Sequence, residues 1–199
     1  MAKLYFYYSS MNSGKSTILL QTAFNYEERN MKVLILLSNI LDTEFVCSRT
    51  GLQRKARIYN YTDCLYDIVK SYNDLSCVLV DEAQFLNKVQ VIELAKVCDT
   101  LNIPVLCYGL RSDFLGEPFE GSMYLLTIAD KLIEIKTMCY CGKKATMNMR
   151  KVNNESDVIT PIFEGTQIKI GGNESYISLC RKCYVQLKSD ALLMASILY

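Results

Sequence analysis

The stretch Ser9–Ser16, which reads Ser-Ser-Met-Asn-Ser-Gly-Lys-Ser, constrains this chain more than any other part of it. It follows the apolar run Leu4–Tyr8 and precedes an amphipathic segment from Thr17 to about Arg29. Strand, tight loop and helix is the setting in which Gly-Lys-Ser binds phosphate, because backbone N–H groups and the helix N-terminus surround the anion. The complete pattern has a glycine where this chain has Ser9. A helix start that contains Gly-Lys-Ser by chance is therefore the alternative interpretation.

The loop predicts an ATP site. Lys15 is expected to place its charge on the β- and γ-phosphates, and the Ser16 hydroxyl is expected to bind Mg²⁺. The residues of the loop predicted to bind ATP and Mg²⁺ are Ser9, Ser10, Met11, Asn12, Ser13, Gly14, Lys15 and Ser16.

The composition narrows the class of protein. A chain of 199 residues, half of them hydrophobic, is enough for one core of ordinary size. A net charge of +1 gives no sign of a nucleic-acid partner, and no apolar run approaches the roughly 18–20 residues of a membrane span. Nine cysteines without a recognisable export signal favour a reducing cytoplasm over a disulfide framework. Histidine is absent, so a general base must be another residue type.

Short apolar runs alternate with helical patterns over residues 1–136. The runs are continuous rather than alternating, as in strands that are covered on both faces. Strands are predicted at Leu4–Tyr8, Val33–Leu37, Cys77–Val80, Pro104–Tyr108 and Lys131–Ile135. Helices are predicted at Thr17–Arg29, Thr62–Tyr72, Asn87–Leu101, where Asn87 is a plausible cap, and Ser122–Ala129. This order predicts an α/β fold with a mostly parallel, doubly wound sheet.

The amino-acid composition of the sequence changes after Lys136. Cysteine pairs and polar residues appear, and glycines punctuate a long connection. We therefore predict an ATP-binding α/β domain over residues 1–136, a small appended domain over 137–188, and a C-terminal tail over 189–199. The apolar residues of that tail are expected to pack on the protein or on a neighbour.

A second nucleotide signal lies at Asp81 and Glu82, which end the apolar run Cys77–Val80. In phosphate-loop enzymes, an aspartate at such a strand end holds Mg²⁺. Phosphoryl transfer to an alcohol also needs a carboxylate that orients the hydroxyl and takes its proton, and Glu82 is the best-placed candidate. A solvated strand end without function is the alternative for this short motif.

Four cysteines form two close pairs. Cys139-Tyr140-Cys141 and Cys180-Arg181-Lys182-Cys183 stand 38 residues apart. Such pairs are typical of a structural Zn²⁺ site with four thiolate ligands, although the first pair is one residue shorter than usual. Buried thiols and a redox pair are the alternatives. With four cysteine ligands, the metal would stabilise the fold rather than carry out chemistry.

Taken together, these motifs resemble the type II thymidine kinase family, which has a P-loop α/β domain and a zinc-bearing lasso domain. The resemblance runs over roughly residues 2–188. It rests on Tyr8–Thr17, Val80–Phe85, Pro104–Arg111, Asp113-Phe114, the four cysteines and Ile170–Tyr176. Bacterial members resemble this chain in both departures, the serine at the first loop position and the short cysteine pair.

The resemblance implies ATP-dependent phosphorylation of the thymidine 5′-hydroxyl, with deoxyuridine as a possible second substrate. It implies that Asp81 lies near Mg²⁺ and that Glu82 accepts the proton, and Gln84 is added to the predicted ATP and Mg²⁺ residues. Positions matching the thymine pocket are Met11, Phe85, Leu110, Phe114 and Phe119, for which core packing is the alternative. The lasso is expected to grip the base through its main chain at about Ile168–Gly172 (Ile168, Ile170, Gly171, Gly172), with Tyr176 closing over the nucleoside.

Two matters stay open at this level. Family members commonly carry Asp-x-Arg after the second strand, whereas this chain reads Asp42-Thr43-Glu44, so that the arginine is missing and Arg49 is a possible substitute. A nucleic-acid-stimulated ATPase and a non-catalytic zinc module are the rival functions. The resemblance implies thymidine and ATP as small-molecule partners and a homotetramer, with no nucleic acid and no membrane as partners.

Overall fold

The computed structural model describes residues 1–152, 160–162, 165–167 and 175–197. The chain divides into two compact units. The first unit comprises Met1–Tyr8, Gly14–Arg111 and Phe119–Ile135, and the second comprises Ser9–Ser13, Ser112–Pro118 and Lys136–Tyr199. The boundary therefore passes through the phosphate loop, between Ser13 and Gly14, and the first part of the loop groups with the cysteine-bearing unit.

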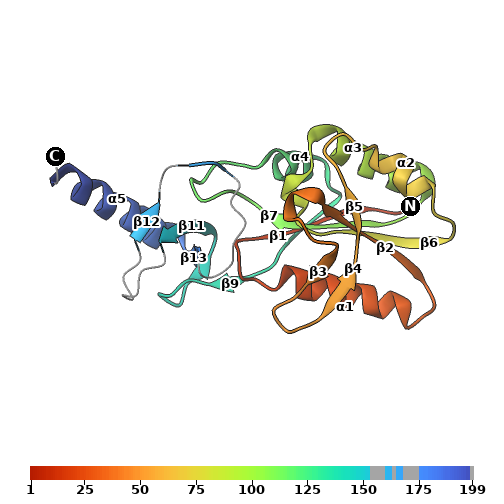
Figure 1. The fold of residues 1–199 in the computed structure, drawn as a ribbon, viewed down its shortest axis with the longest axis horizontal. Coiled ribbons are helices and arrows are strands. Elements are labelled where there is room, and N and C mark those ends of the chain that lie inside the picture. Colours follow the sequence, from red (N-terminus) through yellow and green to blue (C-terminus); the bar gives the residue numbers. More distant parts are fainter. Residues whose placement is uncertain (153–159, 163–164, 168–174, 198–199) are drawn as a thin grey trace. The chain divides into compact units, whose positions relative to one another are not determined.

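A six-stranded sheet forms the centre of the first unit, in the order β5-β2-β6-β7-β1-β8 (Figure 1). Its strands are β1 (Leu4–Ser9), β2 (Lys32–Ser38), β5 (Arg57–Tyr59), β6 (Leu75–Val80), β7 (Val105–Leu110) and β8 (Lys131–Glu134). The pairings β2–β5, β2–β6, β6–β7 and β1–β8 are all parallel. The predicted α/β fold with a mostly parallel sheet is confirmed.

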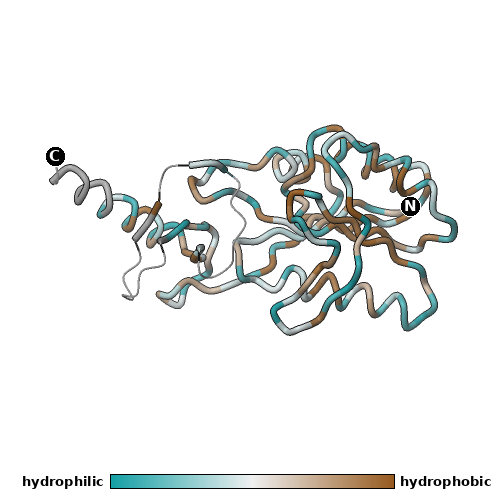
Figure 2. The backbone as a smooth tube through the Cα atoms, in the orientation of Figure 1, coloured by the Kyte–Doolittle hydropathy of each residue, from teal (hydrophilic) through white to brown (hydrophobic). Residues whose placement is uncertain are grey.

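Helices cover both faces of this sheet (Figure 1). One face carries α2 (Leu65–Lys70), α3 (Lys88–Lys96) and α4 (Glu120–Ile128). The other face carries α1 (Lys15–Glu27) and the hairpin of β3 (Phe45–Cys47) and β4 (Gln53–Lys55). Side chains of β6 alternate between the two apolar layers, with Val78 and Val80 in one layer and Cys77 and Leu79 in the other. Both layers are buried, which is why the central strands are continuously hydrophobic (Figure 2).

The helix ends follow local capping chemistry. The side chain of Asn87 accepts a hydrogen bond from the Gln90 N–H, and the Gln90 side chain accepts one from the Asn87 N–H, which forms a capping box. The expected cap at Asn87 is thus confirmed. The predicted helix Asn87–Leu101 is realised as α3 followed by a π-helical turn, η3 (Val97–Leu101).

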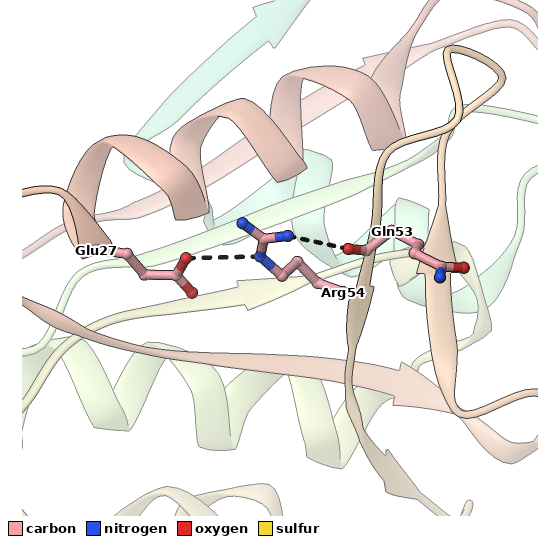
Figure 3. A network of polar contacts seen from close by, with 3 residues as sticks. All are labelled: Glu27, Gln53 and Arg54. Carbon is pink, nitrogen blue, oxygen red and sulfur yellow. Dashed lines mark hydrogen bonds and ion pairs between the residues drawn. The ribbon is translucent and has the colours of Figure 1, made fainter.

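Sequence periodicity did not predict the β3–β4 hairpin or the short strand β5. Both consist of three-residue strands, and such strands are too short to show a reliable alternation. The hairpin is tied to α1 by Arg54, whose Nε lies 3.5 Å from a carboxylate oxygen of Glu27 (Figure 3). Arg54 also donates a hydrogen bond to the Gln53 carbonyl. Because this ion pair is solvent-exposed, it adds about 1 kcal/mol at most, and burial of Val46 is the stronger attachment.

The second unit is built from short strands and one long helix. Its strands are β9 (Thr137–Met138), β10 (Lys144–Ala145), β11 (Met147–Val152), β12 (Thr160–Ile162) and β13 (Tyr176–Leu179). They form the ladder β12-β11-β13 and the pair β10-β9. Helix α5 (Arg181–Ile197) follows, so most of the segment expected as a tail belongs to a helix that starts eight residues earlier. No helix in the described part of the chain has the length and apolar character needed to cross a bilayer.

Candidate active site

The phosphate loop ends at the first turn of α1. Gly14 adopts a left-handed conformation with φ of 80° at the N-cap position and offers no side chain to cap the helix. The N-cap residue therefore makes no side-chain hydrogen bond at the start of α1, and a helix N-terminus of this kind can receive an anion. Lys15, the first residue of the helix, is 8% exposed.

Ser16 and Asp81 come together although 65 residues separate them. The Ser16 hydroxyl donates a hydrogen bond of 2.9 Å to the Asp81 carboxylate, which follows directly after β6. Burial raises the pKa of Asp81 to about 7, and the charge of Glu82 adds to the rise, while the bond from Ser16 opposes it. A hydroxyl and a carboxylate oxygen side by side are the ligands that Mg²⁺ prefers, so these two residues fit that ion.

Lys15 lies within electrostatic range of the same carboxylates. Burial lowers the pKa of Lys15, and the charges of Glu82 and then Asp81 act in the opposite direction. The positive charge of Arg49, from the turn between β3 and β4, also lowers the Lys15 pKa. The Lys15 ammonium is therefore influenced by two carboxylates and by one further cation.

Glu82 occupies a left-handed backbone conformation with φ of 50°, which turns the chain sharply out of β6. Its carboxylate accepts a hydrogen bond from the Gln84 amide nitrogen. The Gln84 amide oxygen accepts a bond of 3.0 Å from the Leu110 N–H at the end of β7. Gln84, which the sequence grouped with the ATP and Mg²⁺ residues, thus connects the Glu82 carboxylate to a neighbouring strand.

Close packing holds this turn, η2 (Ala83–Phe85), in place. An added Cβ on Gly121 of α4 would lie 2.6 Å from the carbonyl oxygens of Ala83 and Leu86. An added Cβ on Gly109 would lie 2.9 Å from the Gln84 amide oxygen. Both glycines are required because backbone or side-chain atoms approach within the space of a methyl group.

Three residues predicted for the thymine pocket lie beside this turn. The rings of Phe85 and Phe119 meet edge to face, with centroids 6.1 Å apart. The Leu110 carbonyl accepts a hydrogen bond from the Ser122 hydroxyl. Phe119 is buried while Phe85 and Leu110 are partly exposed, so the group has both packed and accessible members.

The other predicted contacts belong to the second unit. Met11 is bonded through both of its peptide groups, to Asn148 and to Ser178. Phe114 is stacked under the guanidinium of Arg150, whose central carbon lies 3.8 Å from the ring centroid. Arg150 also donates hydrogen bonds of 3.2 and 3.0 Å to the Tyr176 hydroxyl and one of 3.0 Å to the Thr166 carbonyl. Phe114 and Tyr176 are therefore held by one buried cation.

The four cysteines of the second unit converge on one point. The sulfur atoms of Cys139, Cys141, Cys180 and Cys183 all lie within 4.8 Å of one another. Cys141 and Cys180 are 3.7 Å apart, far beyond a disulfide bond, and all nine cysteines are free thiols. Thiolates bound tetrahedrally at about 2.3 Å would stand at just such separations, so the cluster fits one zinc ion.

Sequence reasoning missed Asn148, Arg150 and Ser178. The signal was present as period-two alternation, in Met147-Asn148-Met149-Arg150 and again in Tyr176-Ile177-Ser178-Leu179. The predicted lasso residues Ile168, Ile170, Gly171 and Gly172 lie outside the residues that the structure describes.

The parallel sheet, the loop at the start of α1 and the carboxylates after β6 define a P-loop nucleotide-binding protein with an appended cysteine-rich unit. A family model described as thymidine kinase matches residues 2–184. Among solved structures, a Pif1 helicase from Candida albicans aligns at 14% identity with a TM-score of 0.42, over 69% of this chain and 36% of that chain, a likeness too distant to carry an argument.

Curated relatives are much more similar. A thymidine kinase of Zymomonas mobilis is 56% identical over 94% of this chain and 97% of its own length. One from Legionella pneumophila is 52% identical over 92% of this chain and 90% of its own. One from Escherichia coli is 50% identical over 96% of this chain and 95% of its own. The chain belongs to the thymidine kinase family.

Proposed function

We propose that this protein transfers the γ-phosphate of ATP to the 5′-hydroxyl of thymidine, giving thymidine monophosphate and ADP. The observation that carries this proposal is identity of 50–56% to thymidine kinases over nearly the whole chain. The arrangement of Lys15, Ser16, Asp81 and Glu82 supports it, because one group of side chains offers the parts that phosphoryl transfer requires.

The phosphates of ATP would bind at the loop Ser9–Ser16. Lys15 would neutralise charge that develops on the transferring group, and the N–H groups at the start of α1 would hold phosphate oxygens. Ser16 and Asp81 would hold Mg²⁺, which would neutralise negative charge on the ATP phosphates. Arg49 would add a second positive charge in place of the arginine that family members commonly carry, and its electrostatic effect on Lys15 supports this role.

Glu82 would orient the 5′-hydroxyl of thymidine and accept its proton as the oxygen attacks phosphorus. The Gln84 amide restricts the direction of the Glu82 carboxylate, so that less reorientation is needed when the nucleoside binds. Most of the catalysis would then be positioning and electrostatics, because the loose transition state needs little covalent help.

The thymine base would contact Met11, Phe85, Leu110, Phe114 and Phe119, and Tyr176 would close over the nucleoside. Aromatic side chains provide flat apolar surfaces for a base, and the rings of Phe114 and Tyr176 are fixed in orientation by Arg150. The segment Ile168–Gly172 is proposed as the main-chain grip on the thymine edge. Deoxyuridine, which differs from thymidine by one methyl group, would be accepted less well.

Three further proposals complete this function. The cysteine cluster would hold a structural Zn²⁺, whose binding contributes folding free energy to the second unit. The free thiols favour action in the reducing cytoplasm. A homotetramer is proposed from the family resemblance, and sedimentation of the purified protein would test it.

The decisive experiment follows labelled γ-phosphate from ATP to thymidine, cytidine, adenosine and water, with and without DNA. We expect label in thymidine monophosphate alone. Release of inorganic phosphate that is stimulated by DNA would instead identify a nucleic-acid-dependent ATPase, and this outcome would overturn the proposal.

A further inference from the structure

Strands β11 and β13 form an antiparallel ribbon whose two faces differ in chemistry. Asn148 stands opposite Ser178, and Arg150 stands opposite Tyr176. Since side chains alternate along a strand, these four residues share one face. All four are buried, which is unusual for polar side chains and requires that their hydrogen bonds be satisfied.

The opposite face of the ribbon is apolar and belongs to the cysteine cluster. Met149 and Leu179 pack in one buried group with Cys139 and Cys180, and Met147 and Ile177 lie against it. Leu179 also precedes Cys180 directly in the chain. The metal-binding cysteines and the polar face are therefore two sides of the same pair of strands.

The side chains of Asn148 and Ser178 both form hydrogen bonds with one residue of the phosphate loop, Met11. The Met11 N–H donates a hydrogen bond of 2.8 Å to the Asn148 side-chain oxygen. The Met11 carbonyl accepts one of 2.6 Å from the Ser178 hydroxyl. Both hydrogen-bonding groups of Met11 are thus satisfied by two side chains that face each other across the ribbon.

Two more hydrogen bonds hold Asn148 and the neighbouring loop residue Asn12 in place. The Asn148 side-chain nitrogen donates to the Ser112 carbonyl at 3.0 Å, which orients the amide so that its oxygen points to Met11. The Thr137 hydroxyl donates to the Asn12 carbonyl at 3.1 Å. In the sequence, Met11 lies four residues before Lys15, within the same predicted phosphate loop.

We propose that Asn148 and Ser178 are positioning residues for the phosphate loop, and that they couple ATP affinity to the folding of the metal-bearing unit. A phosphate loop binds ATP tightly when its N–H groups already point toward the phosphate position. A loosened loop adopts that conformation for only a fraction of the time, which lowers the ATP affinity. The Met11 N–H, already bonded to Asn148, contributes to this arrangement rather than to phosphate contact. This inference rests on the proposed function.

The test is the Ser178→Ala variant, which removes one hydroxyl and leaves the strand intact. We expect the Kd of a fluorescent ATP analogue, measured without thymidine, to rise about tenfold, as expected for a loss near 1.4 kcal/mol. The metal content should stay unchanged, and the KM of thymidine, whose base would also contact Met11, should rise less than the Kd of the ATP analogue. Ser178→Thr keeps the hydroxyl and should restore ATP affinity.

The matched control is Ile177→Val on the apolar face of the same strand. It should lower the melting temperature without changing the ATP affinity of the folded protein, because no contact to Met11 is lost. Asn148→Ala provides a second variant, which removes the acceptor of the Met11 N–H. The double variant should lose less than the sum of the two single losses, because both act on Met11.

Three outcomes are distinguishable. Normal ATP affinity in folded, metal-loaded Ser178→Ala or Asn148→Ala would overturn the inference while leaving the proposed function intact. If the affinities for ATP and thymidine fall equally, and in step with the melting temperature, both residues have only a structural role. This outcome would also overturn the inference. Wild-type protein that binds ATP but transfers no phosphate to thymidine would refute the proposed function instead.

Discussion

Ser16 and Asp81, 65 residues apart in sequence, are joined by a hydrogen bond of 2.9 Å in the first unit. The bond connects the start of α1 to the end of β6. In a parallel sheet the carboxyl ends of all the strands lie at one edge, so the segments after β1 and β6 meet there although β7 lies between the two strands. The consequences of this contact can be measured.

Replacing Asp81 by Asn should separate activity from stability. The amide keeps the size of the carboxylate but removes the charge that would hold Mg²⁺. We expect turnover to fall about 100-fold or more, while the melting temperature without Mg²⁺ is unchanged or higher, because a buried charge is no longer desolvated. Magnesium-dependent kinetics and thermal unfolding check both parts. Activity within about tenfold of wild type would contradict the assigned role.

Replacing Glu82 by Gln should affect the chemical step. A general base contributes roughly 10²–10⁴ to rate, so turnover should fall by that factor while the Kd of ATP changes less than about twofold. Glu27→Gln is the matched control, because Glu27 pairs with the exposed Arg54 and its loss should leave turnover unchanged (Figure 3). Equal effects of the two substitutions would remove Glu82 from its proposed role.

Replacing Gly121 by Ala should damage the turn that carries Glu82. The new methyl group would lie 2.6 Å from two backbone carbonyl oxygens, so α4 or the turn must move. We expect a loss of about 2 kcal/mol in the free energy of unfolding and a lower turnover. Urea denaturation measures the free energy of unfolding. The control is Thr127→Ala on the exposed side of the same helix, which should change that free energy by less than about 0.5 kcal/mol.

Replacing Cys183 by Ser should remove the metal. A four-cysteine site loses most of its metal affinity when one of the four ligands is removed. Because metal binding is coupled to folding, stability falls as well. Elemental analysis should give one zinc per wild-type chain, a lower ratio for the variant, and a lower melting temperature. Cys47→Ser, at an exposed position outside the cluster, should keep the metal. A wild-type protein without metal, or a variant that retains it fully, would contradict the assignment.

Replacing Arg150 by Lys should weaken nucleoside binding. A lysine cannot reproduce the planar stacking on Phe114 together with the bonds to Tyr176 and Thr166. We expect the KM of thymidine to rise at least fivefold, the range of one or two lost hydrogen bonds, with the KM of ATP little changed. Lys151→Arg, the reverse exchange at the adjacent position, serves as the control and should have little effect on either constant.

The features predicted correctly are those that depend on neighbouring residues. Continuous apolar runs marked the strands of a sheet that is buried on both faces, and Asn87 with Gln90 marked the start of α3. The two cysteine pairs were found from spacing alone, and their sulfur atoms do converge. Each of these patterns is complete within a few residues, so no knowledge of distant contacts was needed.

Other features depend on partners far along the chain. Asn148 and Ser178 are polar residues of ordinary appearance, and only the pairing of β11 with β13 places them opposite each other and against Met11. Gln84 was predicted to bind ATP or Mg²⁺, and the bridge that its amide forms between Glu82 and Leu110 is visible only in the folded chain. The need for glycine at position 121 appears only when α4 packs on the turn after β6.

The sequence alone predicted the class of fold, a phosphate loop, two carboxylates after a buried strand and four cysteines that could hold a metal ion. It did so because hydrophobic periodicity and short motifs record the local environment of each residue. The side chains that hold the loop and the Glu82 carboxylate in place are recognised only once the chain is folded. Hydrogen bonds between residues more than 100 positions apart, such as those that join Met11 to Asn148 and Ser178, arise from strand register and packing, which no local pattern encodes.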